Sequence, residues 1–349
     1  MKRKGLAVGI ILLFVGTCII PAIAQDTKTP LPTSRGNWLY VGGSGPGNYT
    51  RIQDAIDNAS TGDIVFVYGG IYFENIRITV SIFLIGENRN ATIIDSNLNE
   101  SAIITLADGV TIQNFTIQNS DEIGIEIKSN YTKILGNVIK NANWTGVQIE
   151  GEFNYRRHDN FISGNIITNN SSCGIYIWRT NQTTIMKNNI SYSKRYGIEI
   201  ILSQYTIITE NKIFNNQGRG ISLWGNSRDN TIFANALKNN GGGILIGDAW
   251  KTNISQNNFE NDGIYLYLST NNLITKNNFF QSSISFSYDG FSNNIWRDNY
   301  WNKQRLLPKP IIGQIGVTIL HGTVYIPRFP WVNFDRHPAQ EPYDIPGMR

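Results

Sequence analysis

Cysteine, histidine and charge are all scarce in this sequence. Cys18 lies in the N-terminal apolar segment, so Cys173 is alone in the rest of the chain and an intrachain disulfide is excluded there. We expect Cys173 to be a small buried filler. His158, His321 and His337 are not at ligand spacing, which argues against copper or another metal, and we expect no cofactor. Charged residues make up only 16% of the chain, whereas glycine and asparagine are frequent, as in turn-rich β proteins.

The first 24 residues have the pattern of a targeting segment. A basic start, an apolar stretch over residues 5–20 and Ala22-Ile23-Ala24 predict a signal peptide over residues 1–24, followed by a linker over 25–37. We therefore expect a secreted or cell-surface protein, with an uncleaved membrane anchor as the alternative. Three of the 30 basic residues and none of the 26 acidic residues lie in this segment. The remaining chain is nearly neutral, which argues against nucleic acid as a partner.

Two short phrases recur together along the chain. A glycine followed by Ile or Val returns at steps of 20 to 28 residues, and Ile-x-x-Asn returns in the same register. The glycines are Gly124, Gly146, Gly174, Gly197, Gly220, Gly243 and Gly263; the asparagines are Asn137, Asn165, Asn188, Asn211, Asn235, Asn257 and Asn277. Apolar residues alternate with other residues after each glycine, which predicts a short strand. Such a repeat leaves no room for helices and has neither a leucine-rich signature nor a propeller period.

This repeat predicts an all-β fold, a single-stranded right-handed parallel β-helix. Residues 64–307 would form about ten rungs that stack at about 4.8 Å and share one apolar core. Asparagine tolerates left-handed backbone angles, and stacked amides can hydrogen-bond along the column. We therefore interpret the repeated asparagines as a structural ladder and not as catalytic residues.

Both ends of such a column need a cover. Ile52, Ala55, Ile56 and Ala59 share one face of a short amphipathic helix, which predicts an N-terminal cap over residues 38–63. Residues 308–349 are predicted to form an irregular C-terminal tail. We expect a hairpin over Ile311–Tyr325 with Gly322 at its turn, followed by a proline-rich segment that wraps the surface because proline disfavours ladder strands.

With these motifs in view, the chain resembles the NosD-like, pectin-lyase-type β-helix proteins that archaea and bacteria export. "YTRIQDAIDNASTGDIVFVYGGIYFENI" and "SIFLIGE" are similar to the first rungs of that family, and the glycine and asparagine phrases to its repeats. The resemblance covers roughly residues 38 to 302 and implies the fold. For function it implies several possibilities, including copper-enzyme maturation and polysaccharide lyases, hydrolases or epimerases, because fold does not specify function.

One rung is longer than the others and offers candidates for catalysis. The extra residues between Gly146 and Gly174 lie in "EGEFNYRRHDN", and inserted loops on rigid scaffolds often carry function. This region combines carboxylates, a cation and an imidazole, in Glu150, Glu152, Arg156, His158 and Asp159. Scattered acids on a solvated sheet and ordinary turn chemistry at Asp159 are the alternatives, so whether the protein is an enzyme is left open, with binding favoured.

Aromatic residues give the leading functional hypothesis. Trp178, Trp224 and Tyr267 follow their glycines by four residues and would form an outward file on every second rung, about 9 to 10 Å apart. Tyr176 and Tyr265 follow by two residues and face the same way. Rings at this spacing could stack on alternate units of an extracellular polysaccharide or cell-envelope polymer. The alternative is that loops cover the rings and that the protein is purely structural.

The sequence also contains about a dozen Asn-x-Ser/Thr sequons, which predict N-glycosylation if the protein is exported. Examples are Asn48, Asn130, Asn143, Asn181 and Asn253. Asn114 and Asn189 are expected to be buried in the ladder or the core and therefore inaccessible.

Overall fold

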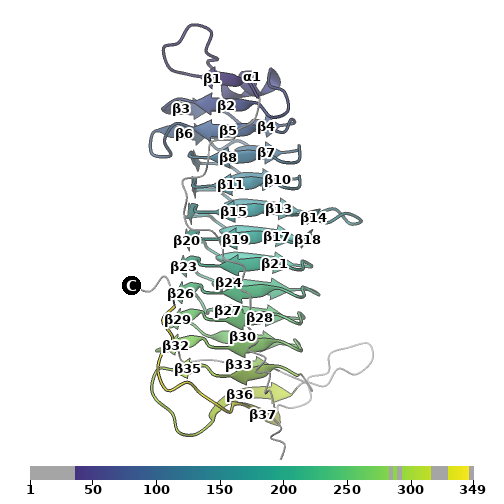
Figure 1. The fold of residues 1–349 in the computed structure, drawn as a ribbon, viewed down its shortest axis with the longest axis vertical. Coiled ribbons are helices and arrows are strands. Elements are labelled where there is room, and N and C mark those ends of the chain that lie inside the picture. Colours follow the sequence, from purple (N-terminus) through teal and green to yellow (C-terminus); the bar gives the residue numbers. More distant parts are fainter. Residues whose placement is uncertain (1–35, 283–285, 289–292, 316–328, 346–349) are drawn as a thin grey trace, which may run out of the picture. The chain divides into compact units, whose positions relative to one another are not determined.

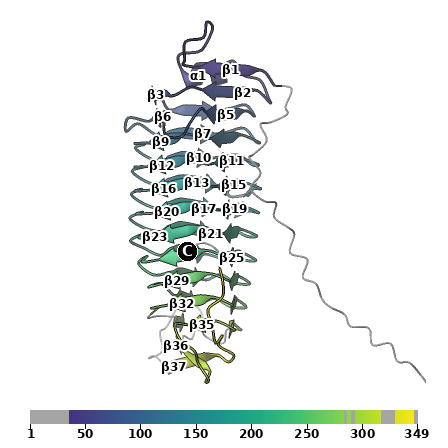
Figure 2. The same ribbon diagram turned by 60° about the vertical axis from the view of Figure 1, so that its left-hand side comes forward.

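The computed structural model describes residues 36–282, 286–288, 293–315 and 329–345. Residues 35–349 form one compact unit, in which short strands coil into a column of about 11 turns (Figures 1 and 2). The predicted signal peptide, most of the linker and Gly322 lie outside the described residues. No helix in the described part of the chain is long and apolar enough to cross a membrane.

Each turn contributes one strand to each of three sheets. Sheet A contains β1 (Trp38–Val41), β2 (Ile64–Val67), β5 (Phe83–Gly86), β8 (Thr111–Gln113), β11 (Lys133–Leu135), β15 (Phe161–Ser163), β19 (Thr184–Met186), β22 (Ile207–Thr209), β25 (Thr231–Phe233), β28 (Asn253–Ser255), β31 (Leu273–Thr275) and β34 (Ile295–Arg297). Sheet B contains β3 (Gly70–Phe73), β6 (Thr92–Asp95), β9 (Thr116–Gln118), β12 (Val138–Lys140), β16 (Ile166–Thr168), β20 (Asn189–Ser191), β23 (Lys212–Phe214), β26 (Ala236–Lys238), β29 (Asn258–Glu260), β32 (Asn278–Phe280) and β35 (Tyr300–Trp301).

Sheet C contains β4 (Ile76–Ile78), β7 (Ile103–Thr105), β10 (Ile125–Ile127), β13 (Val147–Glu150), β17 (Ile175–Trp178), β21 (Ile198–Ile201), β24 (Ile221–Trp224), β27 (Ile244–Gly247), β30 (Ile264–Tyr267), β33 (Phe286–Tyr288), β36 (Lys309–Ile315) and β37 (Phe329–Asp335). Two further strands, β14 (Arg157–His158) and β18 (Thr180–Asn181), pair between sheets C and A. The described strands pair in parallel except for β36 with β37. The predicted parallel β-solenoid is therefore confirmed.

The core is a set of stacked aliphatic files. In sheet C, Ile175 pairs with Ile198 and Ile198 with Ile221, and each of these side chains is fully buried. Sheets A and B supply equivalent files, such as Ile185 over Ile208 and Ile190 over Ile213. Each fully buried aliphatic side chain contributes about 1.5–3 kcal/mol of transfer free energy. The core therefore runs the length of the column without a disulfide.

The repeated asparagines form a continuous hydrogen-bonded row in the turn between sheets A and B. The Nδ2 of each donates to the Oδ1 of the next at 2.9–3.2 Å, from Asn137 through Asn299, and each side chain is at most 1% exposed. Asn299 Nδ2 donates in turn to Asp335 Oδ2 at 3.1 Å. Since a carboxylate only accepts, Asp335 ends the row without leaving a further donor unpaired.

The repeated glycines have a steric cause. A Cβ atom at Gly174 would lie 2.5 Å from Ile190 Cγ2 and 2.7 Å from the Gly197 carbonyl oxygen. A side chain there would separate one rung from the next and push against sheet B. The glycine file therefore allows the close approach of successive turns before each sheet C strand.

The N-terminal cap contains one helix, α1 (Ile52–Asp57), as predicted. Ile52, Ala55 and Ile56 are buried, and Glu74 accepts hydrogen bonds from the backbone amides of Ile52 and Gln53 at 2.8 and 3.0 Å. These bonds pair two of the amides that a helix start leaves open. The segment before the helix differs from the expectation, because β1 (Trp38–Val41) already pairs with β2 as the first strand of sheet A.

β36 and β37 pair as the antiparallel hairpin predicted for the C-terminal segment, with a register symmetric about position 322, but the second strand lies further along the chain than predicted. β36 begins near the predicted hairpin, but its partner is β37 (Phe329–Asp335), which lies in the proline-rich segment that we expected to wrap the surface. Because β37 is the outermost strand of sheet C, Pro330 does not interrupt a ladder on both sides. Its antiparallel pairing covers one end of the column and brings Asp335 to the asparagine row.

Candidate functional site

The outer face of sheet C is the surface that carries most of the predicted binding residues. Trp178, Ile201 and Trp224 are in register on successive strands, and Gly247 is in register with Tyr267. Tyr176 and Tyr265 lie on the same face, two residues earlier in β17 and β30. All five aromatic side chains are half-buried. The register predicted for them is therefore present in the structure.

The spacing predicted for the aromatic file is wrong. The Trp224 ring lies against Gly247, where a Cβ atom would be 2.6 Å from ring carbon atoms. This glycine lets Trp224 reach Tyr267, and their ring centroids are 5.9 Å apart instead of the expected two rung spacings. Trp178 lies beneath the guanidinium of Arg179, 4.9 Å from its ring centroid. The face therefore presents a Trp224–Tyr267 pair and a separate Trp178–Arg179 pair.

A buried acid lies on the same face. Glu199 is in register with Tyr176 but is only 2% exposed, because residues of the turn before its strand pack against it. Its Oε2 accepts from Cys173 Sγ at 3.4 Å and its Oε1 from Arg195 Nη2 at 3.3 Å. Burial raises the pKa of Glu199, which Arg195 partly opposes. Burial, Glu199 and Glu150 raise the pKa of Tyr176 to about 12.

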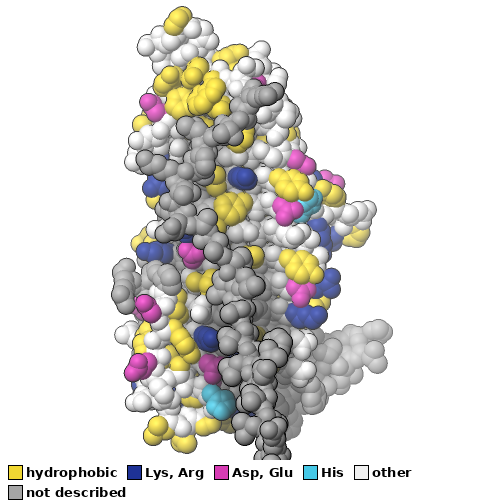
Figure 3. Space-filling model, in the orientation of Figure 1, with side chains coloured by type: hydrophobic (Ala, Val, Ile, Leu, Met, Phe, Trp, Pro, Cys, Tyr) yellow, Lys and Arg dark blue, Asp and Glu magenta, His cyan; other side chains and the backbone are white. Residues whose placement is uncertain are grey.

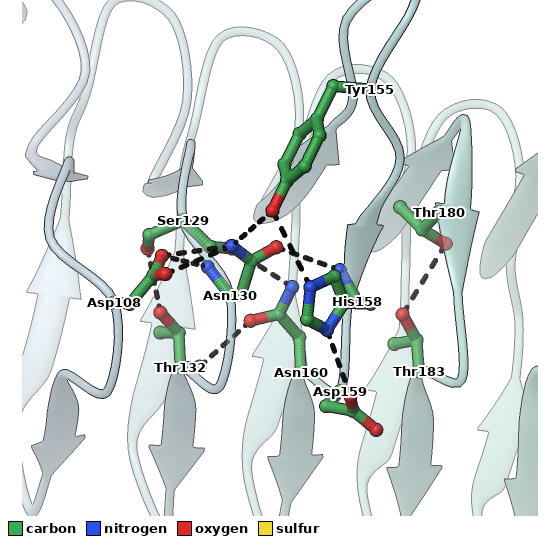
Figure 4. Close-up of polar contacts among 10 residues, drawn as sticks. All are labelled: Asp108, Ser129, Asn130, Thr132, Tyr155, His158, Asp159, Asn160, Thr180 and Thr183. Carbon is green, nitrogen blue, oxygen red and sulfur yellow. Dashed lines mark hydrogen bonds and ion pairs between the residues drawn. The ribbon is translucent and has the colours of Figure 1, made fainter.

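The long loop projects from the column between β13 and β15 and carries β14 (Figure 1). Figure 4 shows the His158 imidazole between the Tyr155 hydroxyl and the Asp159 carboxylate. His158 Nδ1 lies 2.9 Å from Asp159 Oδ2 and its Nε2 lies 3.5 Å from the Tyr155 hydroxyl, which accepts from Asn130 Nδ2 at 3.0 Å. Asn130 also donates to Asp108 at 3.0 Å. This chain fixes the orientation of both His158 and Asp159.

The remaining catalytic candidates do not join this group. Glu152 pairs with Arg157 at 2.7 Å, Arg156 donates to the Leu202 carbonyl, and Glu150 accepts from Gln148 on the sheet C face. Burial and two neighbouring arginines lower the pKa of Arg156. Figure 3 shows basic side chains gathered beside and below the loop, at the right-hand edge. Of the five predicted residues, His158 and Asp159 are therefore in contact, whereas Glu150, Glu152 and Arg156 have other partners.

The structure also places the residues weighed for metal binding and thiol chemistry. Within the described ranges, no three His, Cys, Asp or Glu side chains are grouped to hold a metal ion. His158 is in the loop, His337 follows β37, and His321 lies outside the described residues. Cys173 is buried, and burial raises the pKa of its thiol to about 12, so the thiol stays protonated at neutral pH.

The expectation that the sequon asparagine Asn114 is buried was wrong. Asn130 is 3% exposed and its amide is used by Asp108 and Tyr155, whereas Asn114 is exposed at a left-handed turn position with φ of 65°. The spacing of residues in the sequence did not show which asparagines of these turns point into the column and which point to solvent. Asn143 and Asn253 are exposed, and their modification stays a prediction.

An aromatic cluster that was not predicted lies at the N-terminal end of sheet A. Trp38, Tyr40, Phe66 and Tyr68 have ring centroids 5.2 to 6.2 Å apart between neighbours. Trp38 and Tyr40 are 42% and 38% exposed. The two-residue spacing in Trp38-x-Tyr40 and Phe66-x-Tyr68 was the available signal, and it was lost because residues 38–63 were assigned to a helical cap.

A family described as the right handed beta helix region matches residues 50–182 and 101–259, together more than half of the chain. The chain belongs to this family. No curated protein matches the chain. Its assignment to the NosD-like proteins and to archaea therefore stays a prediction.

Solved structures of other β-helix proteins are similar to this chain at low sequence identity. The A-module of mannuronan C-5 epimerase AlgE6 from Azotobacter vinelandii has a TM-score of 0.58 at 13% identity, covering 71% of this chain and 88% of its own. XylC in complex with xylose has a TM-score of 0.61 at 10% identity, with 80% and 71% covered. Pectate lyase Pel9A has a TM-score of 0.54 at 12% identity, with 77% and 80% covered. These similarities establish the fold alone.

Proposed function

We propose that this β-helix protein binds a polysaccharide along the outer face of sheet C. The observation that carries the proposal is the register of Trp178, Trp224 and Tyr267 with Tyr176 and Tyr265 on one rigid sheet face. Aromatic rings bind apolar C–H faces of sugars, and a solenoid holds them without further ordering on binding. The named relatives that act on mannuronan and pectate, or hold xylose, support the ligand class.

We also propose that the protein is located outside the cytoplasm, at the cell surface or in the medium. This proposal rests on the basic and apolar pattern of residues 1–24. An extracellular polysaccharide or a polymer of the cell envelope is then the expected ligand. Cell fractionation with an antibody against the chain tests this part, and recovery in the cytoplasm alone would contradict it.

The binding surface is tested with mannuronan, pectate and xylan in affinity electrophoresis or calorimetry. We expect at least one polymer to bind and the double variant Trp178→Ala, Trp224→Ala to weaken binding about tenfold or more, since each removes a ring contact worth about 1 kcal/mol. Trp38→Ala with Tyr40→Ala is the matched control, because it removes two exposed rings from sheet A. Equal losses in the two double variants, or a loss in the control alone, would contradict the assignment to sheet C.

A second candidate function is acid–base catalysis on the bound polymer. The specific observation is Glu199, a buried carboxyl with a raised pKa that lies beside Arg195 and in register with Tyr176. Perturbed acids beside a binding surface are candidates for proton transfer. Product analysis after incubation with uronic-acid polymers tests it: Glu199→Gln should abolish turnover and leave binding intact, whereas Glu126→Gln should change neither. Absence of any turnover by the wild type would leave binding as the function.

A further inference from the structure

A pocket lies on a different part of the column, at the turn between sheets C and A. Its volume is about 550 Å³, and it spans three consecutive rungs. Its lining consists of Asp159, Asn181, Gln182, Thr184, Tyr205 and Ile207. A volume between about 300 and 1,000 Å³ is usual for small-ligand sites. None of these residues belongs to the aromatic surface of sheet C.

The turn geometry explains why polar and aromatic side chains converge here. Asp159, Gln182 and Tyr205 occupy equivalent turn positions with φ of 55°, 51° and 55°, so their backbones share one left-handed conformation. Parallel bridges tie the adjacent residues His158, Asn181 and Gln204 into a short ladder. The floor of the pocket is therefore fixed by backbone pairing, while Tyr205 and Ile207 remain 50% and 44% exposed at its wall.

Two side chains of the lining carry unpaired acceptor oxygens, of which Asn181 Oδ1 is covered by protein atoms and the Asp159 carboxylate is partly exposed. Asn181 Oδ1 is buried and has no hydrogen-bond partner, a condition that costs about 1–3 kcal/mol when nothing fills it. The Asp159 carboxylate is held through Oδ2 by His158 Nδ1 at 2.9 Å, and His158 is itself positioned by Tyr155. This arrangement leaves Asp159 Oδ1 available to a ligand, beside the carboxamide of Gln182 and the hydroxyl of Thr184.

We infer that this pocket binds one neutral sugar unit. A carboxylate and carboxamides accept and donate to neighbouring hydroxyl groups, and the Tyr205 ring offers a surface for the C–H face of a pyranose. Within the lining, the Asp159 charge disfavours an anionic sugar, and it opposes the attraction of the nearby Arg228, which donates to Gln204 at 2.8 Å. A single carboxylate is a poor site for a divalent cation. The inference does not depend on the sheet C proposal, because the two sites share no residue.

The test measures binding of methyl glycosides of glucose, galactose and mannose to the full chain, with glucuronate for comparison, by saturation-transfer NMR and titration. We expect saturable one-to-one binding of at least one neutral glycoside, weakened about tenfold by Tyr205→Ala and by Asn181→Ala, a factor that corresponds to about 1.4 kcal/mol. Tyr192→Ala is the matched control, because Tyr192 has φ of 55° and is 55% exposed in another turn. It should change affinity less than twofold.

Three outcomes would overturn the inference: no saturable binding of any neutral glycoside in the millimolar range, equal effects of Tyr205→Ala and Tyr192→Ala, or tighter binding of glucuronate. Gln182→Ala provides a second variant at an exposed side chain, so that a folding defect in Asn181→Ala does not decide the result. Trp178→Ala with Trp224→Ala should leave glycoside binding unchanged. If that variant loses polysaccharide but keeps the glycoside, the two sites are independent.

Discussion

The turns on the two sides of sheet A belong to the same rungs but differ in how constant their lengths are. From β8 to β35, every turn between sheets A and B has two residues. Between sheets C and A the turns have five or six residues over the same part of the column, except for ten between Glu150 and Phe161. The uniform turn carries the buried asparagine row, and the variable turn carries the loop and the pocket. The continuous asparagine row thus lies in the turn of constant length, and the pocket lies beside the turn whose length varies.

The largest expected effect comes from breaking the uniform turn. Asn211 donates to the carbonyls of Ile185 and Thr209 and to Asn235 Oδ1, and it accepts from Asn188. Asn211→Ala should lower the free energy of unfolding by about 3 kcal/mol or more, because several buried groups lose their partners at about 1–3 kcal/mol each. Urea denaturation measures the change.

Asn253→Ala is the control for this prediction, because Asn253 is exposed on the outer side of β28. It should change the free energy of unfolding by less than about 0.5 kcal/mol. If both variants lost a similar free energy of unfolding, the stabilising effect of asparagine would not depend on its place in the row.

A shorter row in the turn between sheets B and C provides a pH test. Asn216 Nδ2 donates to Asn240, and Asn240 Nδ2 donates to the buried Asp262 at 2.6 Å. Burial raises the pKa of Asp262 to about 6, against the hydrogen bonds from Asn240. An acid with a raised pKa is favoured in the fold when protonated, so its contribution is lost as pH rises through about 6, by up to about 3 kcal/mol.

Asp262→Asn should remove this loss. Its Oδ1 can accept from Asn240 as Asn240 accepts from Asn216, through both the backbone amide and Nδ2. Denaturation midpoints at pH 4 and pH 8 should differ less in the variant than in the wild type, with the variant more stable at pH 8. An unchanged pH dependence would show that Asp262 ionises without cost in the fold.

The smallest effect is expected at the variable turn. Phe153 is 78% exposed at the loop, although its carbonyl accepts from Arg179 and its ring lies under that guanidinium. Phe153→Ser keeps the carbonyl and should alter the free energy of unfolding by less than about 0.5 kcal/mol. A loss as large as that of Asn211→Ala would remove the distinction between the two turns.

Sequence reasoning succeeded where the backbone repeats. Gly174 and Asn211 were identified because equivalent positions in stacked rungs have the same backbone environment and therefore favour the same residue. The regular spacing of these residues in the sequence shows this directly. The register of Trp178 with Trp224 followed from the same steps. The contact between Trp224 and Tyr267 did not, because it depends on side-chain directions and on the missing side chain at Gly247.

The remaining errors have tertiary causes. The strand at Phe329–Asp335 forms because the last rung offers an open edge, a condition that local proline content does not reveal. The catalytic candidates are close in sequence, but their partners come from different rungs and turns: Arg156 donates to the Leu202 carbonyl, whereas His158 contacts Asp159. The sequence did not single out Glu199, because its burial depends on Cys173 and Arg195, which precede it by 26 and 4 residues.

Hydroxyl-radical footprinting with and without the bound polysaccharide tests the account most directly, because it reports the exposure of individual aromatic side chains. We expect protection of Trp178, Trp224, Tyr265 and Tyr267 on sheet C. The exposed residues Trp38, Tyr40 and Tyr192 should keep their reactivity. Protection of Trp38 and Tyr40, with sheet C unchanged, would contradict the assignment of the binding surface.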